Sequence, residues 1–382
     1  MKILWFSNAP WAPTGYGQQT AQVVRRLVGA GHEVTIAANF GLMAGSTVWE
    51  GVTVLPGGSD KYSADALAAH AEALGQDWII TLYDVWVLPE LASRHRVASW
   101  TPVDHFPCPP EVAAHLKGHF PIAMTRYGQS ELRDHGLNAR YVPHAIESVF
   151  APRESSFREA MEIPADAFLV MVNAANLGTH PPRKAWWEML SGFKLFASQH
   201  TDIFLYLHTN PTSASGVNLP FLIAQLDIKD KVRVVPQYPY RYGSIPPEVL
   251  AEAYSASDVL LASSMGEGFG VPVIEAQACG IPVIVTDFAS QPELVGAGWK
   301  VGHQAWYDPA QASMLTVPNI KSIAAALEEA YRAKGTMGDA ARAFAAQYDA
   351  DLVFDTYWRP VLAEMAAEVA PRPKRQRRKY KR

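Results

Sequence analysis

MGEGFGVPVIEAQACGIPVIVTD, residues 265–287, combines a glycine loop, a short helix and a strand, and an apolar run at 258–263 precedes it. The length and apolar content of that run predict a buried strand. The loop contains the glycines Gly266, Gly268 and Gly270. Glycines let the backbone turn tightly and approach a ligand closely, while Pro272 suits a helix start and Gly280 a helix stop. A glycine loop that opens a helix presents free N–H groups, so this stretch predicts a phosphate site.

Two carboxylates flank the predicted site. Glu267 lies in the loop, and Glu275 lies one turn into the helix. An acid beside a phosphate would repel it, so we expect both to accept hydrogen bonds from hydroxyl groups. Alone, Glu267 could be a solvated loop acid and Glu275 an acid that the helix dipole favours. Together with the glycines, the pair favours a ligand that carries a ribose at one end of a diphosphate and a sugar at the other.

Residues 267–276 fit without a gap the frame Glu-Gly-Phe-Gly-x-Pro-x-x-Glu-Ala. This frame resembles the nucleotide-binding motif of the retaining glycosyltransferases of family 4. The resemblance implies the glycosyltransferase-B fold, in which two doubly wound, Rossmann-like α/β domains face each other across a cleft. It covers nearly the whole chain up to about residue 367, although its specific motif lies in the second half.

The composition is that of a globular protein, because 49% of the 382 residues are hydrophobic and 18% are charged. The two cysteines, Cys108 and Cys279, are far apart and have no metal-like spacing. This usage fits a reducing compartment, and we expect a cytoplasmic protein without a disulfide framework or structural zinc. No apolar run reaches transmembrane length, and the first residues predict a strand rather than a signal peptide.

Strands and helices alternate along the chain, which predicts parallel sheets with helices on both faces. We expect a first, acceptor-side domain over residues 1–150 and a second, nucleotide-sugar-binding domain over 151–350. The segment 142–152 resembles the crossing between the domains in the family. A last helix over 351–368, which contains Trp358, is expected to cross back onto the first domain. Residues 369–382 form a basic tail that is expected to be disordered.

Loops of the first half are expected to lie at the ligand edge of its sheet, beyond the carboxyl ends of the strands. One loop carries Gly15 and Gly17 ahead of a helix expected from about residue 18. The family has a glycine-rich loop here, near the donor phosphates and the acceptor; the alternative is a plain loop with a helix cap. The two glycines do not make the three-glycine dinucleotide fingerprint, since Thr20 stands at the third position.

Polar residues follow two other strands of this half. Asp104 and His105 come directly after one, and His is the usual proton handler near neutral pH. A family histidine in this region often faces the transferred sugar, which makes both residues catalytic candidates; the alternative is a histidine that only holds the loop. Asp84 follows another strand and could reach the acceptor, although a structural role is favoured for it.

Arg183 and Lys184 fall in the first turn of a helix expected over residues 183–199. Cations oppose the helix dipole there, so their presence indicates an anion that neutralises them. The family uses an arginine and a lysine here to hold the diphosphate. Its arginine commonly stands nearer Ala175, so the assignment of Lys184 is the firmer of the two.

The resemblance implies transfer of a hexosyl group from a UDP- or GDP-sugar with retention of configuration, without a metal or a cofactor. Glu267 would hold sugar hydroxyls and Glu275 the ribose. The N–H groups at Gly268, Phe269 and Gly270 would stabilise the leaving diphosphate. The alternatives are a nucleotide-sugar epimerase of the same fold and a nucleic-acid-binding protein with a vestigial sugar site.

The net charge of −4 hides a basic tail, because residues 371–382 hold eight of the 33 basic residues and no acid. The tail could be only a solvated end. It could also bind anionic lipid or the phosphate backbone of a nucleic acid. Glu364 and Glu368 in the preceding helix would repel anionic lipid, which favours DNA and a modified base as acceptor. Protein and lipid acceptors stay open.

Overall fold

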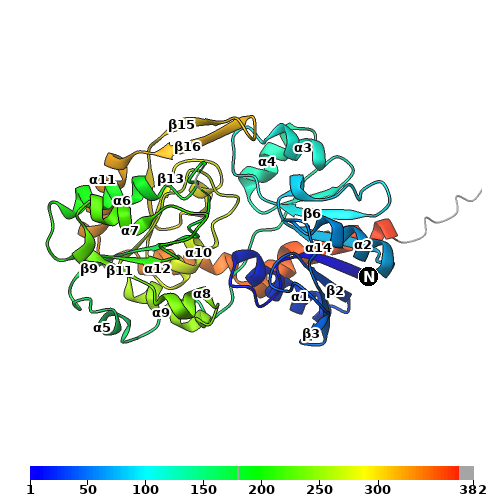
Figure 1. Cartoon of the computed structure of the whole chain (residues 1–382), viewed down its shortest axis with the longest axis horizontal. Helices are drawn as coiled ribbons and strands as arrows, with labels where there is room; N and C mark the ends of the chain where they lie inside the picture. The colour runs from blue at the N-terminus through cyan, green and yellow to red at the C-terminus, as the bar shows by residue number, and fades with distance from the viewer. Residues whose placement is uncertain (179, 370–382) are drawn as a thin grey trace, which may run out of the picture.

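The computed structural model describes residues 1–178 and 180–369. Two α/β domains lie side by side, the first drawn in blue to cyan and the second in green to yellow (Figure 1). This arrangement confirms the predicted fold class of two doubly wound domains. The predicted tail over 371–382 lies outside the described residues.

The first domain is built on an eight-stranded sheet with the order β3-β4-β2-β1-β5-β6-β7-β8. All neighbouring strands are parallel except β3 and β4. The strands are β1 Lys2–Ser7, β2 Glu33–Ala38, β3 Thr47–Trp49, β4 Val52–Leu55, β5 Trp78–Leu82, β6 Val97–Thr101, β7 Phe120–Ala123 and β8 Arg140–Tyr141. Since alternate residues of β1 face opposite ways, Ile3 and Trp5 pack in one core and Leu4 and Phe6 in another.

Helices cover both faces of this sheet. They are α1 Gly15–Gly29, α2 Ala64–Leu74, α3 Pro110–His115 and α4 Arg126–Asp134, with a short 3-10 helix at Val85–Val87. The helix α1 begins at Gly15 rather than near residue 18, because the Thr14 side chain accepts a hydrogen bond from the backbone N–H of Gly17 and caps it there.

The second domain has a six-stranded parallel sheet with the order β11-β10-β9-β12-β13-β14. Its strands are β9 Phe168–Asn173, β10 Ile203–His208, β11 Val232–Val234, β12 Val259–Ala262, β13 Val283–Thr286 and β14 Gly298–Val301. Its helices are α5 Phe157–Ala160, α6 Trp186–Ala197, α7 Leu219–Gln225, α8 Gln237–Arg241, α9 Pro247–Ala256, α10 Val271–Ala278, α11 Ile320–Arg332 and α12 Gly338–Ala345. Residues of α6 and α11 cover one face, and residues of α9 and α10 cover the other.

An antiparallel hairpin stands outside both sheets and has no counterpart in the sequence-based prediction. It consists of β15, His303–Asp308, and β16, Ser313–Pro318. The hairpin reaches toward α3 and α4 of the first domain (Figure 1), and Met314 pairs with Phe106 through two backbone hydrogen bonds. It therefore brings a part of the second domain onto the loop that carries Asp104 and His105.

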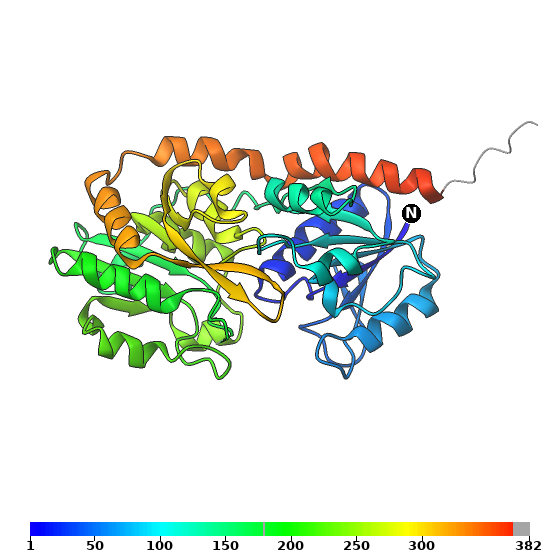
Figure 2. The ribbon, with the colours of Figure 1, turned by 90° about the horizontal axis from the view of Figure 1, so that it is seen from above.

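After α12, drawn in orange over the second domain, the last helices run along the first domain in red (Figure 2). They are α13 Ala350–Val353, a π-helical turn at Phe354–Trp358, and α14 Arg359–Val369. Trp358 packs against Trp5 and Trp100, with ring centroids 6.1 and 5.0 Å away. The chain thus ends its described part on the core of the domain in which it began.

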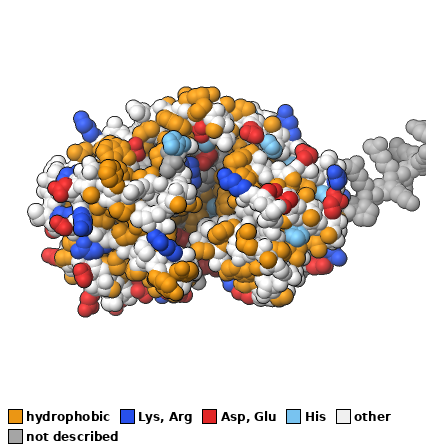
Figure 3. All heavy atoms as spheres, viewed as in Figure 1, with side chains coloured by type: hydrophobic (Ala, Val, Ile, Leu, Met, Phe, Trp, Pro, Cys, Tyr) orange, Lys and Arg blue, Asp and Glu red, His pale blue; other side chains and the backbone are white. Residues whose placement is uncertain are grey.

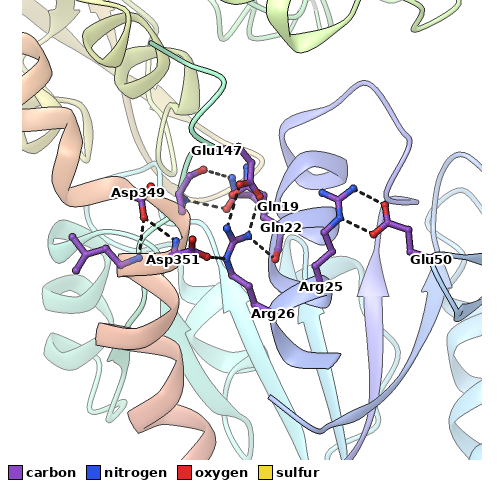
Figure 4. Close-up of polar contacts among 10 residues, drawn as sticks. Gln19, Gln22, Arg25, Arg26, Glu50, Glu147, Asp349 and Asp351 are labelled. Carbon is purple, nitrogen blue, oxygen red and sulfur yellow. Dashed lines mark hydrogen bonds and ion pairs between the residues drawn. The ribbon is translucent and has the colours of Figure 1, made fainter. Parts of the chain in front are cut away.

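A polar latch, defined as Arg26, Glu147 and Asp351, joins three parts of the chain (Figure 4). Arg26 on α1 donates from Nη1 to Glu147 at 2.9 Å and from Nε to Asp351 at 2.8 Å. Glu147 belongs to the crossing between the domains, and Asp351 to α13. The latch therefore ties both crossings to the first domain.

Among the described residues, no helix is both long and apolar enough to span a membrane.

Candidate functional site

Figure 3 shows a deep recess between the domains with charged side chains near its base. The loops that follow β6 and β12 meet between the two domains. Two glycines of the 265–270 loop touch the first domain there. A side-chain carbon at Gly266 would lie 2.3 Å from the Asp104 carbonyl oxygen, and one at Gly268 would lie 2.2 Å from Pro102 Cβ. The glycines therefore serve a close approach between the domains, which the sequence alone did not indicate.

The third glycine begins the helix α10. Gly270 has φ 109° and is the N-cap, a conformation that side chains rarely adopt. Phe269 is buried and packs edge-on against His144 and Tyr348, with centroids 5.1 and 5.8 Å away. The Phe269 side chain thus anchors the loop, which fixes the backbone at the start of α10.

The side chains of Lys184 and Arg183 form ion pairs with the Glu267 carboxylate. Lys184 Nζ lies 2.5 Å from Glu267 Oε1, and Arg183 Nη1 lies 3.1 Å from Oε2. Burial alone would raise the pKa of the Glu267 carboxyl, but Lys184 and Arg183 outweigh it and lower the pKa to about 2. The three predicted site residues are therefore brought together, with the carboxylate standing where an anion meets both cations.

The two cations are not in a helix, which corrects the expectation from the sequence. The helix α6 begins at Trp186, and Ala185 before it has φ 48° and ψ 43°. This left-handed residue separates the helix from Arg183 and Lys184, so both lie in the loop that follows β9. Burial lowers the pKa of Lys184 despite the opposing charge of Glu267.

His105 lies between two carboxylates from different domains. Its Nδ1 is 2.7 Å from Asp104 Oδ1, and its Nε2 is 3.3 Å from Asp308 Oδ2 on the hairpin. Burial opposes charge on the imidazole, but the two acids outweigh it and raise its pKa. Because an ionised carboxylate only accepts hydrogen bonds, this geometry favours a His105 imidazole that carries a proton on both nitrogens. His105 is 6% exposed and fastens the two domains as it stands.

Asp104 connects the contacts of His105 to the two cations, Arg183 and Lys184. Its Oδ2 lies 3.8 Å from Arg183 Nη1. Burial would raise the pKa of Asp104, but the hydrogen bond from His105 and the charge of Arg183 lower it to about 2. The structure thus gathers Asp104, His105, Arg183, Lys184 and Glu267 in one charged network.

Gly15 and Gly17 lie at the start of α1 and have different surroundings. A side-chain carbon at Gly17 would lie 2.3 Å from the Ala12 carbonyl oxygen, so only glycine fits there. Gly15 has no atom within 4 Å of such a carbon and borders open space. Tyr16 lies between them. Burial and the charges of Asp84 and Asp104 raise the pKa of the Tyr16 hydroxyl, and the charge of Arg183 lowers it. The start of α1 therefore faces the charged network.

Glu275 stands apart from that network. It is 2% exposed, and its Oε2 accepts a hydrogen bond from Tyr254 on α9 at 2.8 Å. Tyr254 in turn accepts one from Asn173 at the end of β9, at 2.7 Å. Burial raises the pKa of Glu275 to about 7, against the effect of the Tyr254 hydrogen bond.

Sequence reasoning missed two acids that act between the domains. Asp308 meets His105 from the hairpin, and Glu293 accepts hydrogen bonds from the backbone N–H groups of Arg126 and Tyr127 at 2.9 and 2.8 Å. Glu293 thereby caps α4 from the other domain. Neither acid has a local signal, because its partners lie more than 150 residues away along the chain.

The part of the chain that the structure describes has no group of three or more His, Cys, Asp or Glu placed to hold a metal ion.

Comparison with known proteins points to one group of enzymes. Residues 216–342 match the family model described as "Glycosyl transferases group 1". O-antigen chain mannosyltransferase B of Escherichia coli is 37% identical over 73 residues, which are 19% of each chain. D-inositol 3-phosphate glycosyltransferase of Thermobispora bispora is 30% identical over 144 residues, 36% of this chain and 31% of that protein. The matches thus span less than a third of these relatives.

Solved structures match over nearly the whole chain. Sucrose-phosphate synthase of Thermosynechococcus elongatus has a TM-score of 0.74 at 17% identity, covering 96% of this chain and all of that one. HepE of Anabaena, solved in complex with UDP and glucose, has a TM-score of 0.66 at 14% identity over 96% of this chain and 99% of that one. The chain therefore has the glycosyltransferase-B fold that the resemblance implied.

Proposed function

We propose that this protein is a glycosyltransferase that moves a hexosyl group from a nucleotide-sugar to an acceptor with retention of configuration and without a metal ion. The observation that carries the proposal is the position of Arg183 and Lys184 on Glu267, beside the glycine loop that opens α10. The match over residues 216–342 supports the reaction class. Retention rests on the frame at 267–276, and the donor on HepE, whose structure contains UDP and glucose.

In the proposed reaction the donor diphosphate lies at the start of α10. It forms ion pairs with Arg183 and Lys184 in place of Glu267. The bond between the anomeric carbon and the phosphate oxygen breaks with its electron pair on that oxygen, and an acceptor oxygen bonds to the same carbon. Lys184, Arg183 and the N–H groups after Phe269 stabilise the negative charge that develops on the leaving group. Glu267, released from the cations, accepts hydrogen bonds from the sugar hydroxyls.

Glu275 is proposed to hold the ribose of a UDP- or GDP-sugar. A carboxylate that binds two ribose hydroxyls must be ionised, so donor binding would displace the proton that burial favours on this residue. Catalytic roles for His105 and Asp104 remain hypotheses from the sequence. The present contacts of His105 on both ring nitrogens require it to give up Asp308 before it can reach a sugar.

The test is incubation with labelled UDP- and GDP-sugars and a cell extract as a source of acceptors. A glycosyltransferase yields free nucleoside diphosphate and a labelled product. An epimerase yields an isomerised donor, and a nucleic-acid-binding protein with a vestigial site yields neither. Lys184→Ala should abolish turnover, whereas Lys229→Ala, at an exposed lysine of the same domain, should leave it unchanged.

The acceptor is not identified by the contacts described above. A modified base in DNA is the hypothesis that the tail over 371–382 suggests, and protein and lipid acceptors are its alternatives. We propose that the acceptor enters from the first-domain side of the recess.

A further inference from the structure

Four aromatic side chains of the first domain form a continuous wall, defined here as Tyr16, Tyr83, Tyr62 and Trp86. Tyr83 contacts Tyr16 at 5.8 Å and Tyr62 at 6.4 Å between ring centroids, and Tyr62 contacts Trp86 at 5.7 Å. Every ring is partly exposed. Tyr16 starts α1 beyond β1, and Tyr83 and Trp86 follow β5, so the wall lies at the carboxyl edge of the sheet.

Asp84 stands within this wall, between Tyr83 and Trp86 in the chain. In the described part of the chain, the hydrogen bond to its carboxylate comes from its own backbone, and Arg183 forms its ion pairs with Asp104 and Glu267 instead. Burial and the charge of Asp104 raise the pKa of Asp84 to about 6, and Arg183 opposes them from the other domain. A half-buried carboxylate that faces the charged network therefore has no partner from another residue.

We propose that the aromatic wall and Asp84 bind the acceptor, and that the acceptor is an uncharged saccharide whose hydroxyl groups donate to Asp84. This inference rests on the proposed glycosyltransferase function. Aromatic rings cover the apolar C–H faces of a sugar, and a carboxylate accepts hydrogen bonds from its hydroxyls more strongly than a neutral oxygen does. Asp84 acts here as an acceptor-binding residue: during transfer the proton of the attacking hydroxyl passes to the departing diphosphate oxygen.

The charges along the wall disfavour an anionic acceptor. Asp84 and Asp104 follow neighbouring strands and repel phosphate groups. Lys61 does lie over the Tyr62 ring, with Nζ 4.8 Å from the centroid, but it is exposed and does not adjoin Tyr16 and Tyr83, the inner part of the wall. The partner that fits the inner part of the wall is neutral.

The ring angles disfavour a flipped nucleobase. Neighbouring planes are inclined by 55°, 63° and 79° along the wall. A flat base gains most from a parallel aromatic face, and the tilted rings offer a folded surface instead. A puckered sugar ring, with C–H groups pointing in several directions, suits such a surface better.

The experiment uses the full chain and the nucleotide-sugar that it turns over. Three kinds of acceptor are compared: methyl α-glucoside and methyl α-mannoside, mannose 6-phosphate, and a DNA duplex that carries 5-hydroxymethylcytosine. Transfer to the neutral glycosides is the expected result. Transfer confined to the sugar phosphate or the duplex, or to none of the three kinds, overturns the proposal.

Asp84→Asn keeps the shape of the side chain and removes its charge. It should raise the KM for the neutral glycoside about ten- to hundredfold, as expected for a lost hydrogen bond to a charged group. The donor KM should stay unchanged. Glu90→Gln, at an exposed acid of the same segment, is the matched control. Tyr62→Ala should raise the same acceptor KM.

The outcomes separate this inference from the proposed function. If the unaltered protein does not turn over any nucleotide-sugar, the proposed function fails. If it does so and Asp84→Asn leaves the acceptor KM unchanged while the melting temperature shows a folded protein, only the acceptor site fails.

Discussion

Arg26, in the first domain, and Arg183, in the second, stand in similar settings. Each arginine lies between two carboxylates, and each set joins parts of the chain that are far apart in sequence. Arg26 meets Glu147 and Asp351 behind α1, whereas Arg183 meets Glu267 and Asp104 in the recess. The two arginines show how a structural set of ion pairs differs from a binding site that has the same residue types.

Arg26 is fully engaged. Its Nη1 also donates to the carbonyl oxygen of Gln22 at 3.0 Å, and its Nη2 donates to Glu147 at 3.2 Å (Figure 4). A cavity of about 680 Å³ adjoins this region, but its charged side chains, including Arg25 and Arg359, pair with one another or with nearby acids. An incoming ion would have to break these pairs, so the latch region is structural.

Arg183 is also firmly bonded, since its Nη1 donates to the Gly266 carbonyl oxygen at 2.6 Å, but it has a second cation beside it. Its distance to Asp104 is 3.8 Å, and Lys184 shares the same carboxylate of Glu267. The two cations can pair with a diphosphate, and the released Glu267 carboxylate can then accept hydrogen bonds from the sugar hydroxyls. The difference therefore lies in the second cation next to a helix start, not in the presence of an arginine.

After the loss of turnover in Lys184→Ala, the largest effect is expected for Arg183→Ala. Loss of a cation aimed at the leaving group should lower kcat/KM for donor turnover by about 10²–10³-fold. The free energy of unfolding should change little, since Lys184 still pairs with Glu267. Steady-state assays and urea unfolding check both. Equal losses of turnover in Arg183→Ala and Arg26→Ala would remove the distinction between the two arginines.

Donor binding should depend on pH through Glu275. Its pKa of about 7 means that the carboxyl gains a proton as the pH falls below 7. If only the ionised form binds ribose, the donor KM rises about tenfold per pH unit below that value. Glu275→Gln should have a high donor KM that no longer varies between pH 5 and 7. A variant with the pH profile of the unaltered protein would show that another group titrates.

The free energy of unfolding should also depend on pH through Glu275, but it should be higher at low pH, where donor binding is weaker. The folded pKa of about 7 lies above the ordinary value of 4.5. The folded protein therefore binds the proton more tightly than the unfolded chain, and this contribution to stability is full below pH 4.5 and is lost as the pH rises through 7. Urea unfolding of Glu275→Gln should lack this part of the profile.

The latch should affect stability without affecting turnover. Arg26→Met keeps much of the side-chain volume and removes the pairs with Glu147 and Asp351. Because Asp351 is 83% exposed, we expect a loss of only about 1 kcal/mol in the free energy of unfolding. Donor turnover should stay unchanged. A strong loss of turnover at an unchanged melting temperature would mean that the latch controls how the domains close.

The fold and the centre of the site could be predicted from sequence because their signals are local. The glycine loop, its strand and its helix lie within about thirty residues, and so do the frame residues Glu267 and Glu275. Contacts between distant segments could not be predicted, as with His105 and Asp308, which lie 203 residues apart. The helix start near Arg183 was misplaced because Ala185 adopts a left-handed backbone that alanine rarely shows. The sequence favours a structural role for Asp84, because only the structure shows that its carboxylate has no partner from another residue.

The smallest effect on the enzyme is expected from deletion of residues 371–382. These residues lie outside both arginine sets, so the melting temperature and the donor turnover should not change. The deletion removes eight cations and no acid, so any affinity for duplex DNA at low salt should fall and its salt dependence should flatten, because fewer counterions are released on binding. Electrophoretic mobility shifts at several salt concentrations provide the measurement. Equal DNA binding with and without the tail would end the hypothesis of a DNA acceptor recruited by it. It would leave the recess, with its aromatic wall, as the place where acceptor choice is made.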